Sequence, residues 1–205
     1  MTNNARNNLT KVYYFLSRIY GITIKTYGTM YSLEDKRALI KGMQEKYRLG
    51  TLIETGTYKG DALEYLKNSF PKLISIELVD ERFKAAVERF KNDPHIKLVH
   101  GDSGEKLAEV LSAIKTPCMF WLDGHYSGGN TIRAKKDTPI YEEMCAIFNN
   151  GIKNNIILID DARLFLGRYD YPWLHDLKRE VDKLSKNSYK MSVEKDIIVL
   201  MPKEH

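Results

Sequence analysis

Three aspartates follow two short apolar segments of this chain. Asp123 ends the first segment, and the pair Asp160 and Asp161 ends the second. Carboxylates gathered without a counter-charge repel one another, so one of them would be forced to take up a proton. A hard divalent cation relieves this repulsion, because carboxylate oxygens suit Mg²⁺, Mn²⁺ or Ca²⁺. A metal site on these three residues is therefore one hypothesis, and pairing with the nearby Arg163 is the other.

His125 stands two residues beyond Asp123. An imidazole titrates near neutral pH and can take the proton of an attacking hydroxyl, so His125 is a candidate general base. A hydrogen-bonded loop histidine with no chemical role would look the same in the sequence. We therefore expect His125 and Asp123 to be the catalytic residues, with the loop histidine as the alternative.

A glycine-bearing turn follows the apolar segment 52–53 and runs Glu54-Thr55-Gly56-Thr57-Tyr58-Lys59-Gly60. Gly56 and Gly60 permit a tight turn and the close approach of a ligand to the backbone. The turn is not the dinucleotide fingerprint, because Tyr58 stands where that motif has its second glycine and a pyrophosphate needs a bare backbone. A ligand without phosphates has no such need. A tight strand-to-helix turn without any ligand is the alternative.

Polar residues also follow two further predicted strands. Glu77 lies about 20 positions after the glycine turn and ends the second strand, which suits the two vicinal hydroxyls of a ribose. Asp102 and Ser103 follow the third strand, where Asp102 could accept from an adenine amino group. The alternatives are an exposed strand-end acid for Glu77 and a helix N-cap for Asp102 or Ser103.

Strands that alternate with helices are needed to position these residues. The sequence predicts strands over 52–53, 73–76, 96–99, 118–122 and 156–159, each followed by a segment with helical spacing. Such alternation predicts parallel crossover units with helices on both faces of the sheet. Ligands of open α/β sheets bind at the carboxyl ends of the strands, where all the residues above are expected.

Both ends of the chain add to this core. Ser32 and Asp35 form a capping pattern before a helix that runs to about Tyr47. The C-terminal segment 189–201 predicts an antiparallel hairpin with its turn at 194–196. We expect a Rossmann-like, doubly wound α/β fold with a mostly parallel seven-stranded sheet. Its single domain would span 1–205, with an N-terminal helical extension over 1–48 and the core over 50–205.

Composition narrows the class of protein. The chain is 43% hydrophobic and 29% charged, which is ordinary for a globular protein and excludes a disordered or fibrous one. Its formal charge of +5 comes without a basic run, so a nucleic-acid partner is not expected. Cys118 and Cys145 lack partners at metal-ligand spacing and indicate reduced thiols in a cytoplasmic protein. No apolar run approaches the roughly 20 residues of a transmembrane segment.

An apolar stripe precedes the first capped helix. Its members recur at helical spacing and could dock on the domain, on a second subunit or weakly on a membrane, with the first two uses favoured, so a homodimer is an open expectation. The stripe consists of Leu9, Val12, Tyr13, Leu16 and Ile19.

Together these residues resemble the metal-dependent branch of class I S-adenosylmethionine O-methyltransferases. The turn 54–60 is similar to the Glu-x-Gly-x-Tyr-x-Gly turn of catechol O-methyltransferase, and Asp123 with Asp160 and Asp161 matches the metal acids of that family. The catechol enzyme has Asp-Asn where this chain has Asp-Asp. In this respect the chain is more similar to the sugar O-methyltransferases of macrolide and aminocoumarin biosynthesis. Their base is the second residue after the first metal acid, where aminocoumarin-type enzymes carry aspartate and this chain has His125.

The resemblance implies a donor site, a metal site and an acceptor. Glu77 would hold the ribose of S-adenosylmethionine, and Asp102 with Ser103 its adenine end. The other donor-binding residues would be Glu54, Gly56, Thr57, Tyr58, Gly60 and Asp123. Mg²⁺ or another divalent ion on Asp123, Asp160 and Asp161 would activate a hydroxyl of a sugar, glycan or other polyol.

Three alternatives remain open. They are a catechol-type small-molecule enzyme, a nucleic-acid methyltransferase and a non-catalytic module that binds S-adenosylmethionine. Against the second, the Asp-Pro-Pro-Tyr type of motif used for base amines does not follow the strand 118–122, where Asp123-Gly-His-Tyr stands.

Overall fold

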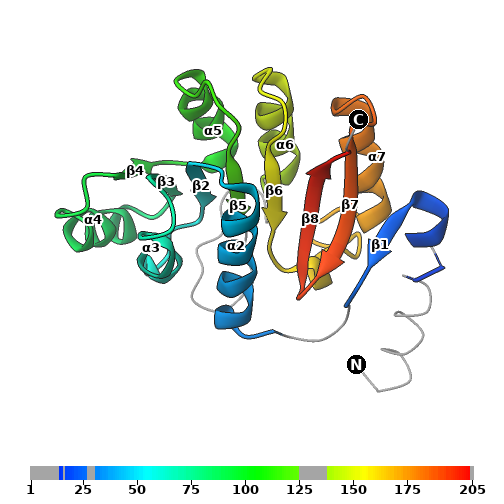
Figure 1. The fold of residues 1–205 in the computed structure, drawn as a ribbon, viewed down its shortest axis with the longest axis horizontal. Coiled ribbons are helices and arrows are strands. Elements are labelled where there is room, and N and C mark those ends of the chain that lie inside the picture. The colour runs from blue at the N-terminus through cyan, green and yellow to red at the C-terminus, as the bar shows by residue number, and fades with distance from the viewer. Residues whose placement is uncertain (1–13, 16, 27–30, 125–137, 204–205) are drawn as a thin grey trace.

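The structure is a computed structural model that describes residues 14–15, 17–26, 31–124 and 138–203. These residues form one eight-stranded sheet in the order β1-β7-β8-β6-β5-β2-β3-β4 (Figure 1). Its strands are β1 Ile22–Ile24, β2 Thr51–Thr55, β3 Lys72–Glu77, β4 Ile96–His100, β5 Met119–Leu122, β6 Ile156–Ile159, β7 Tyr189–Glu194 and β8 Ile197–Pro202. Neighbours among β2 to β6 are parallel, and β8 runs antiparallel between β6 and β7. The predicted Rossmann-like sheet with a C-terminal hairpin is confirmed.

The central strands are buried on both faces. In β5, Met119 and Trp121 face one apolar cluster while Phe120 and Leu122 face the other. The two clusters alternate because successive side chains of a strand point to opposite sides of the sheet. Continuous apolar runs such as 119–122 are therefore what a parallel sheet covered on both faces requires.

Of the helices with defined bounds in the described residues, three lie on each face of the sheet. On one face lie α5 Ser103–Ser112, α6 Ile140–Asn149 and α7 Leu174–Leu184, and on the other α2 Leu33–Tyr47, α3 Asp61–Leu66 and α4 Asp80–Arg89. In Figure 1, α2 lies in front of the central strands and α7 behind the hairpin. A short 3-10 helix, η1 Ala162–Leu164, follows β6. None of the helices in the described part of the chain combines the length and apolar composition that crossing a bilayer requires.

Helix α2 starts where the capping pattern predicts. The backbone N–H of Asp35 donates to the Ser32 hydroxyl at 3.1 Å, and that hydroxyl donates to the Asp35 carboxylate at 2.7 Å. The helix ends at Arg48, whose φ of 53° is left-handed. Ile40 is fully buried against the sheet. A capped start and a buried side chain about two turns later fix α2 on the sheet.

The N-terminal extension also supplies the eighth strand, which the helical expectation for 1–48 did not include. Strand β1 pairs in parallel with β7, from Ile22 opposite Met191 to Ile24 opposite Val193. Its β-branched residues suit a pleated, half-buried strand. Of the predicted apolar stripe, Ile19 is 60% exposed, and its other four members lie outside the described residues.

The β7–β8 hairpin brings its turn to the carboxyl end of β6. Lys195 and Asp196 both have positive φ, of 51° and 63°, as a tight two-residue hairpin turn requires. Because β8 runs antiparallel to β6, with Ile198 opposite Ile159, the turn before β8 lies beside the residues that follow β6. The turn therefore faces Asp160 and Asp161.

Candidate functional site

The strand order changes direction between β2 and β5. From β2 the chain proceeds outward through β3 to β4, and it then returns to place β5 on the other side of β2. Ligands of such sheets bind outside the carboxyl ends of the strands at this switch point. The described residues with predicted roles all lie at the carboxyl ends of strands, in the turns that follow them or at the start of the next helix. They are Glu54, Gly56, Thr57, Tyr58, Gly60, Glu77, Asp102, Ser103, Asp123, Asp160 and Asp161.

Gly56 makes room for protein backbone. A Cβ at this position would lie 2.5 Å from the carbonyl oxygen of Asp123 and 3.0 Å from the Cα of Gly124. Its φ of 86° is also one that side chains disfavour. The close approach that was expected at Gly56 is therefore made by the backbone that follows β5. This contact brings the ends of β2 and β5 together.

Glu77 ties the end of β3 to the turn after β2. One oxygen accepts from the backbone N–H of Tyr58 and the other from that of Val79, both at 2.8 Å. The side chain is buried. An ionised carboxylate offers about four lone-pair sites, so two backbone bonds leave capacity for two ligand hydroxyls.

Tyr58 projects from the same turn. Its φ is 50°, its side chain is 44% exposed, and the Arg82 guanidinium lies 4.7 Å from the centre of its ring. A side chain of this size stands where a pyrophosphate would need bare backbone. The turn therefore favours a ligand that carries no phosphate.

Glu54 is a fully buried acid at the end of β2. The hydroxyl of Ser75 donates to it at 2.5 Å, and the hydroxyl of Thr57 lies 2.6 Å from that of Ser75. Burial raises the pKa of Glu54 to about 8, and the nearby Glu77 adds to this, while the Ser75 hydrogen bond opposes it. Glu54 is therefore largely protonated at neutral pH.

This raised pKa predicts a pH-dependent stability. Between the ordinary pKa of 4.5 and about 8, the folded protein holds a proton on Glu54 that the unfolded chain releases. The free energy of unfolding should fall by about 1.4 kcal/mol for each pH unit of that range. Glu54→Gln mimics the protonated acid and should remove this part of the slope, measured by urea unfolding at pH 5.5 and 7.5. An unchanged slope in Glu54→Gln, with exposed Glu88→Gln as the control, would contradict the shift.

Asp102 and Ser103 begin α5. The carboxylate of Asp102 accepts from the backbone N–H of Gly104 at 2.9 Å and caps the helix, so Asp102 has the structural role that was its alternative. Ser103 is buried and donates to Glu143 of α6 at 2.7 Å. Burial raises the pKa of Glu143 to about 7. Contact of Asp102 or Ser103 with an adenine stays a prediction.

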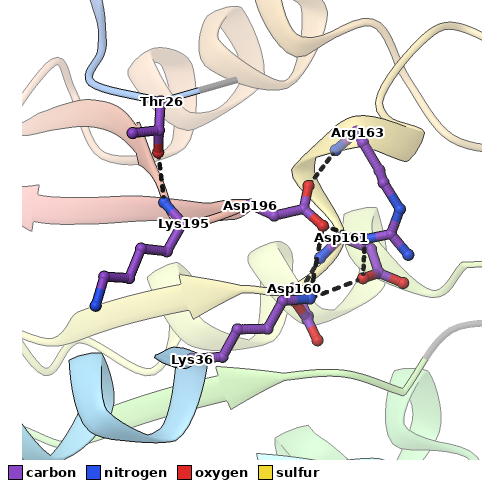
Figure 2. A network of polar contacts seen from close by, with 7 residues as sticks. All are labelled: Thr26, Lys36, Asp160, Asp161, Arg163, Lys195 and Asp196. Atoms are coloured by element: carbon purple, nitrogen blue, oxygen red, sulfur yellow. Dashed lines mark hydrogen bonds and ion pairs between the residues drawn. The ribbon is translucent and has the colours of Figure 1, made fainter. Parts of the chain in front are cut away.

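A buried charge cluster forms where β6, the hairpin turn and α2 meet (Figure 2). The Lys36 ammonium contacts one oxygen of Asp160 at short range, one of Asp161 at 3.0 Å and one of Asp196 at 3.6 Å. All four side chains are buried. Burial lowers the pKa of Lys36, but Asp160 and Asp161 outweigh it, so the pKa lies above its ordinary value and the ammonium stays charged.

Arg163 is a second cation in this cluster. Its guanidinium donates to Asp161 at 2.6 Å and, at short range, to Asp196. Its backbone N–H also donates to Asp196 at 2.9 Å, which fixes η1 on the hairpin turn. The pairing of Asp161 with Arg163, which was the alternative to a metal site, is therefore present.

Asp123 lies near these acids. Burial raises its pKa well above the usual range, and Asp160, Asp161 and Glu54 add to the shift, while Lys36 opposes it. Among the described residues, however, the acids whose oxygens lie within 4.8 Å of one another are Asp160, Asp161 and Asp196. Asp196 thus stands where the metal hypothesis had Asp123.

The fit of a divalent ion can be judged from these contacts. Three carboxylate oxygens form a set that Mg²⁺ or Ca²⁺ would accept. Yet the ammonium of Lys36 contacts an oxygen of each of the three acids, and the Arg163 guanidinium contacts two of them. An ion and the ammonium cannot share one position, so the arrangement does not fit a metal.

Sequence reasoning missed Lys36 and Asp196. A signal for Asp196 was present, because the predicted hairpin turn must lie at the carboxyl end of the strand beside β8. Lys36 had no comparable signal, because one lysine in an amphipathic helix is expected to be solvated. The predicted base, His125, lies outside the described residues, so its role stays a prediction.

No family model and no curated protein sequence matches this chain. Solved methyltransferases match its fold. An O-methyltransferase of Streptomyces achromogenes, involved in tomaymycin synthesis and in complex with SAM, is 14% identical with a TM-score of 0.61, covering 85% of this chain and 82% of that one. An SAH-bound methyltransferase of Podospora anserina is 14% identical, with a TM-score of 0.56 and coverage of 85% and 80%. An O-methyltransferase of Bacillus cereus in complex with SAH is 10% identical, with a TM-score of 0.56 and coverage of 99% and 92%. The chain therefore has the Rossmann-like methyltransferase fold.

Proposed function

We propose that this chain is an S-adenosylmethionine-dependent O-methyltransferase that acts on a hydroxyl of a sugar or glycan. The fold supports the general class, because the solved structures that match it include O-methyltransferases with bound SAM or SAH. The observation that carries the donor assignment is Glu77, a buried acid at the end of β3 whose carboxylate is held against the turn after β2.

The residues at this edge fit a nucleoside without phosphate. Glu77 has acceptor capacity for two ribose hydroxyls, and Tyr58 stands where a pyrophosphate would bind. Glu54, Gly56, Thr57 and Gly60 shape the turn for the amino-acid end of the donor. Asp102, Ser103 and Asp123 complete the proposed donor site. Bound there, S-adenosylmethionine would supply an electrophilic methyl group on a positively charged sulfur.

The residues of this chain would position the two reactants and remove the proton of the acceptor hydroxyl. Methyl transfer would form a bond from the acceptor oxygen to the methyl carbon and break the carbon–sulfur bond, whose electron pair would stay on sulfur. The acceptor hydroxyl must then lose its proton, and His125 is the proposed base. Holding the two reactants in line can lower the barrier by roughly 7–11 kcal/mol.

The acceptor class rests on the sequence resemblance. The Asp-Gly and Asp-Asp patterns at 123–124 and 160–161 favour a sugar or other polyol. In that family the corresponding acids hold a metal ion, whereas here the Lys36 ammonium contacts Asp160 and Asp161. The proposed reaction therefore does not use a metal ion. The alternative is an enzyme that depends on Mg²⁺, and it would lose its methyl-transfer activity when a chelator removes the ion.

Two further parts of the proposal concern the setting of the enzyme. A cytoplasmic location is supported by the two free cysteines, Cys118 and Cys145. Self-association through the N-terminal apolar stripe would be measured by light scattering, and a monomer at all concentrations would remove it.

The proposal is tested by calorimetry with S-adenosylmethionine, followed by transfer of a labelled methyl group to panels of sugars, nucleotide sugars, catechols and RNA. We expect saturable binding and label on a sugar acceptor. His125→Ala should bind the donor normally and lose most of its turnover, because the contribution of a general base is about 100- to 10,000-fold.

Each other outcome identifies an alternative. Binding without transfer to any acceptor would indicate a non-catalytic module. Label on a catechol or on RNA would correct the acceptor class, and RNA binding would also weaken steeply with salt. Absence of donor binding would reject the proposal.

A further inference from the structure

We propose that Lys36 provides, from within the protein, the positive charge that a divalent ion would otherwise provide at Asp160, Asp161 and Asp196. Its ammonium would be a permanent structural cation of the site, and the site would not bind a metal. The inference draws on the proposed function only in naming the reaction that runs without a metal. Its main test measures ion binding.

The position of Lys36 is fixed from several directions. It is the fourth residue of α2, inside the turn that Ser32 caps. The next turn buries Ile40 on the sheet. The ammonium therefore reaches the ends of β6 and the hairpin from a helix that is itself anchored, as Figure 2 shows.

The location of this lysine is unfavourable without the acids. The first turn of a helix carries partial positive charge, which disfavours a cation there. A buried ammonium without partners would also lose its hydration without compensation. Three carboxylates at the ends of β6 and in the hairpin turn offset both effects. The acids and the lysine thus each require the other.

The charge balance leaves little for a metal to neutralise. Three acids, Asp160, Asp161 and Asp196, face two cations, Lys36 and Arg163, so with all five groups ionised the formal charge is −3 + 2 = −1. A divalent ion would turn this into +1 if both cations stayed. It would also have to displace an ammonium whose side chain is only 5% exposed.

The test measures Mn²⁺ binding with two methods, electron paramagnetic resonance and thermal unfolding. The intact protein should show no saturable binding up to roughly millimolar Mn²⁺, where even weak oxygen-ligand sites fill. Lys36→Met removes the ammonium and keeps an unbranched side chain that is one heavy atom shorter. We expect this variant to gain at least a tenfold higher affinity for Mn²⁺ and an unfolding temperature that rises with Mn²⁺. Adding Asp160→Asn to Lys36→Met should remove the new site.

Lys178→Met is the matched control, because Lys178 is also a buried lysine, paired with Asp182 at 2.5 Å on α7. It should lose stability without gaining a metal site. Saturable Mn²⁺ binding by the intact protein, abolished by Asp160→Asn, would overturn the proposal, and so would a folded Lys36→Met that binds no better than the intact protein. If Lys36→Met does not fold without metal, recovery of the fold on refolding with Mn²⁺ supports the proposal. In that case the titration of the intact protein remains decisive, because saturable Mn²⁺ binding by the intact protein would overturn the proposal. These outcomes stand whether or not methyl transfer is found.

Discussion

Replacing Glu77 with alanine should weaken the binding of S-adenosylmethionine by at least roughly 100-fold. A hydrogen bond to a charged group is worth about 1.5–3 kcal/mol, and the proposed carboxylate accepts two from the ribose. The same carboxylate accepts from the backbone N–H groups of Tyr58 and Val79, so its loss also loosens the turn that borders the donor. Isothermal titration calorimetry of the intact protein and of Glu77→Ala measures the change.

Exposed Glu81, in the first turn of α4, provides the control for a general loss of negative charge. Glu81→Ala should bind the donor as the intact protein does. Circular dichroism separates lost binding from lost fold. A folded Glu77→Ala that retains full affinity would remove Glu77 from the ribose and leave it a purely structural acid.

Replacing Asp160 with alanine should lower the free energy of unfolding by about 3–5 kcal/mol, as expected when one partner of a buried ion pair is removed. Lys36 would keep only the more distant Asp161 and Asp196, and the backbone N–H of Asp161 would lose its acceptor at 2.7 Å. Urea unfolding at pH 7 measures the loss. In the double variant Lys36→Met/Asp160→Ala, the loss should be smaller than the sum of the two single losses, because the unpaired charge is gone.

An exposed pair of the same chemistry supplies the comparison. Asp80 and Lys84 are 2.6 Å apart on the surface of α4. Asp80→Ala should leave the stability nearly unchanged, since solvent screens exposed ion pairs. Equal losses for Asp80→Ala and Asp160→Ala would mean that burial of the Lys36 cluster has no energetic consequence.

The core of the fold could be predicted because its signals are local. Apolar runs such as 156–159 alternate with helical spacing, and the residues between them cap helices or turn the chain. The hairpin at 189–202 follows from the period-two pattern of its first strand, the continuous apolar run of its second strand and a turn between them that tolerates positive φ. Strand β1 could not be predicted in this way, because three residues carry too little pattern and its partner β7 is some 170 positions away.

The residues of the candidate site also differ in whether a local sequence signal predicts them. Residues that end a strand or directly follow one, such as Glu77 and Asp160, were expected at the correct edge of the sheet. Lys36 was not, because a contact between a helix and a strand end 124 residues apart leaves no trace in the spacing of either. Burial alone separates this lysine from its exposed neighbours, and only the tertiary structure reveals which lysine is buried.

The short strand β1 has a consequence for how the protein behaves at high concentration. A hairpin at the end of a sheet would present β7 as an open edge, on which a strand of another molecule could pair. Strand β1 takes up the backbone groups around Met191–Val193, and the bond from the Lys195 N–H to the Thr26 hydroxyl holds the end of the segment in place. Since β1 is itself three residues long, it offers an incoming strand a poor template, and this side of the protein is protected against aggregation.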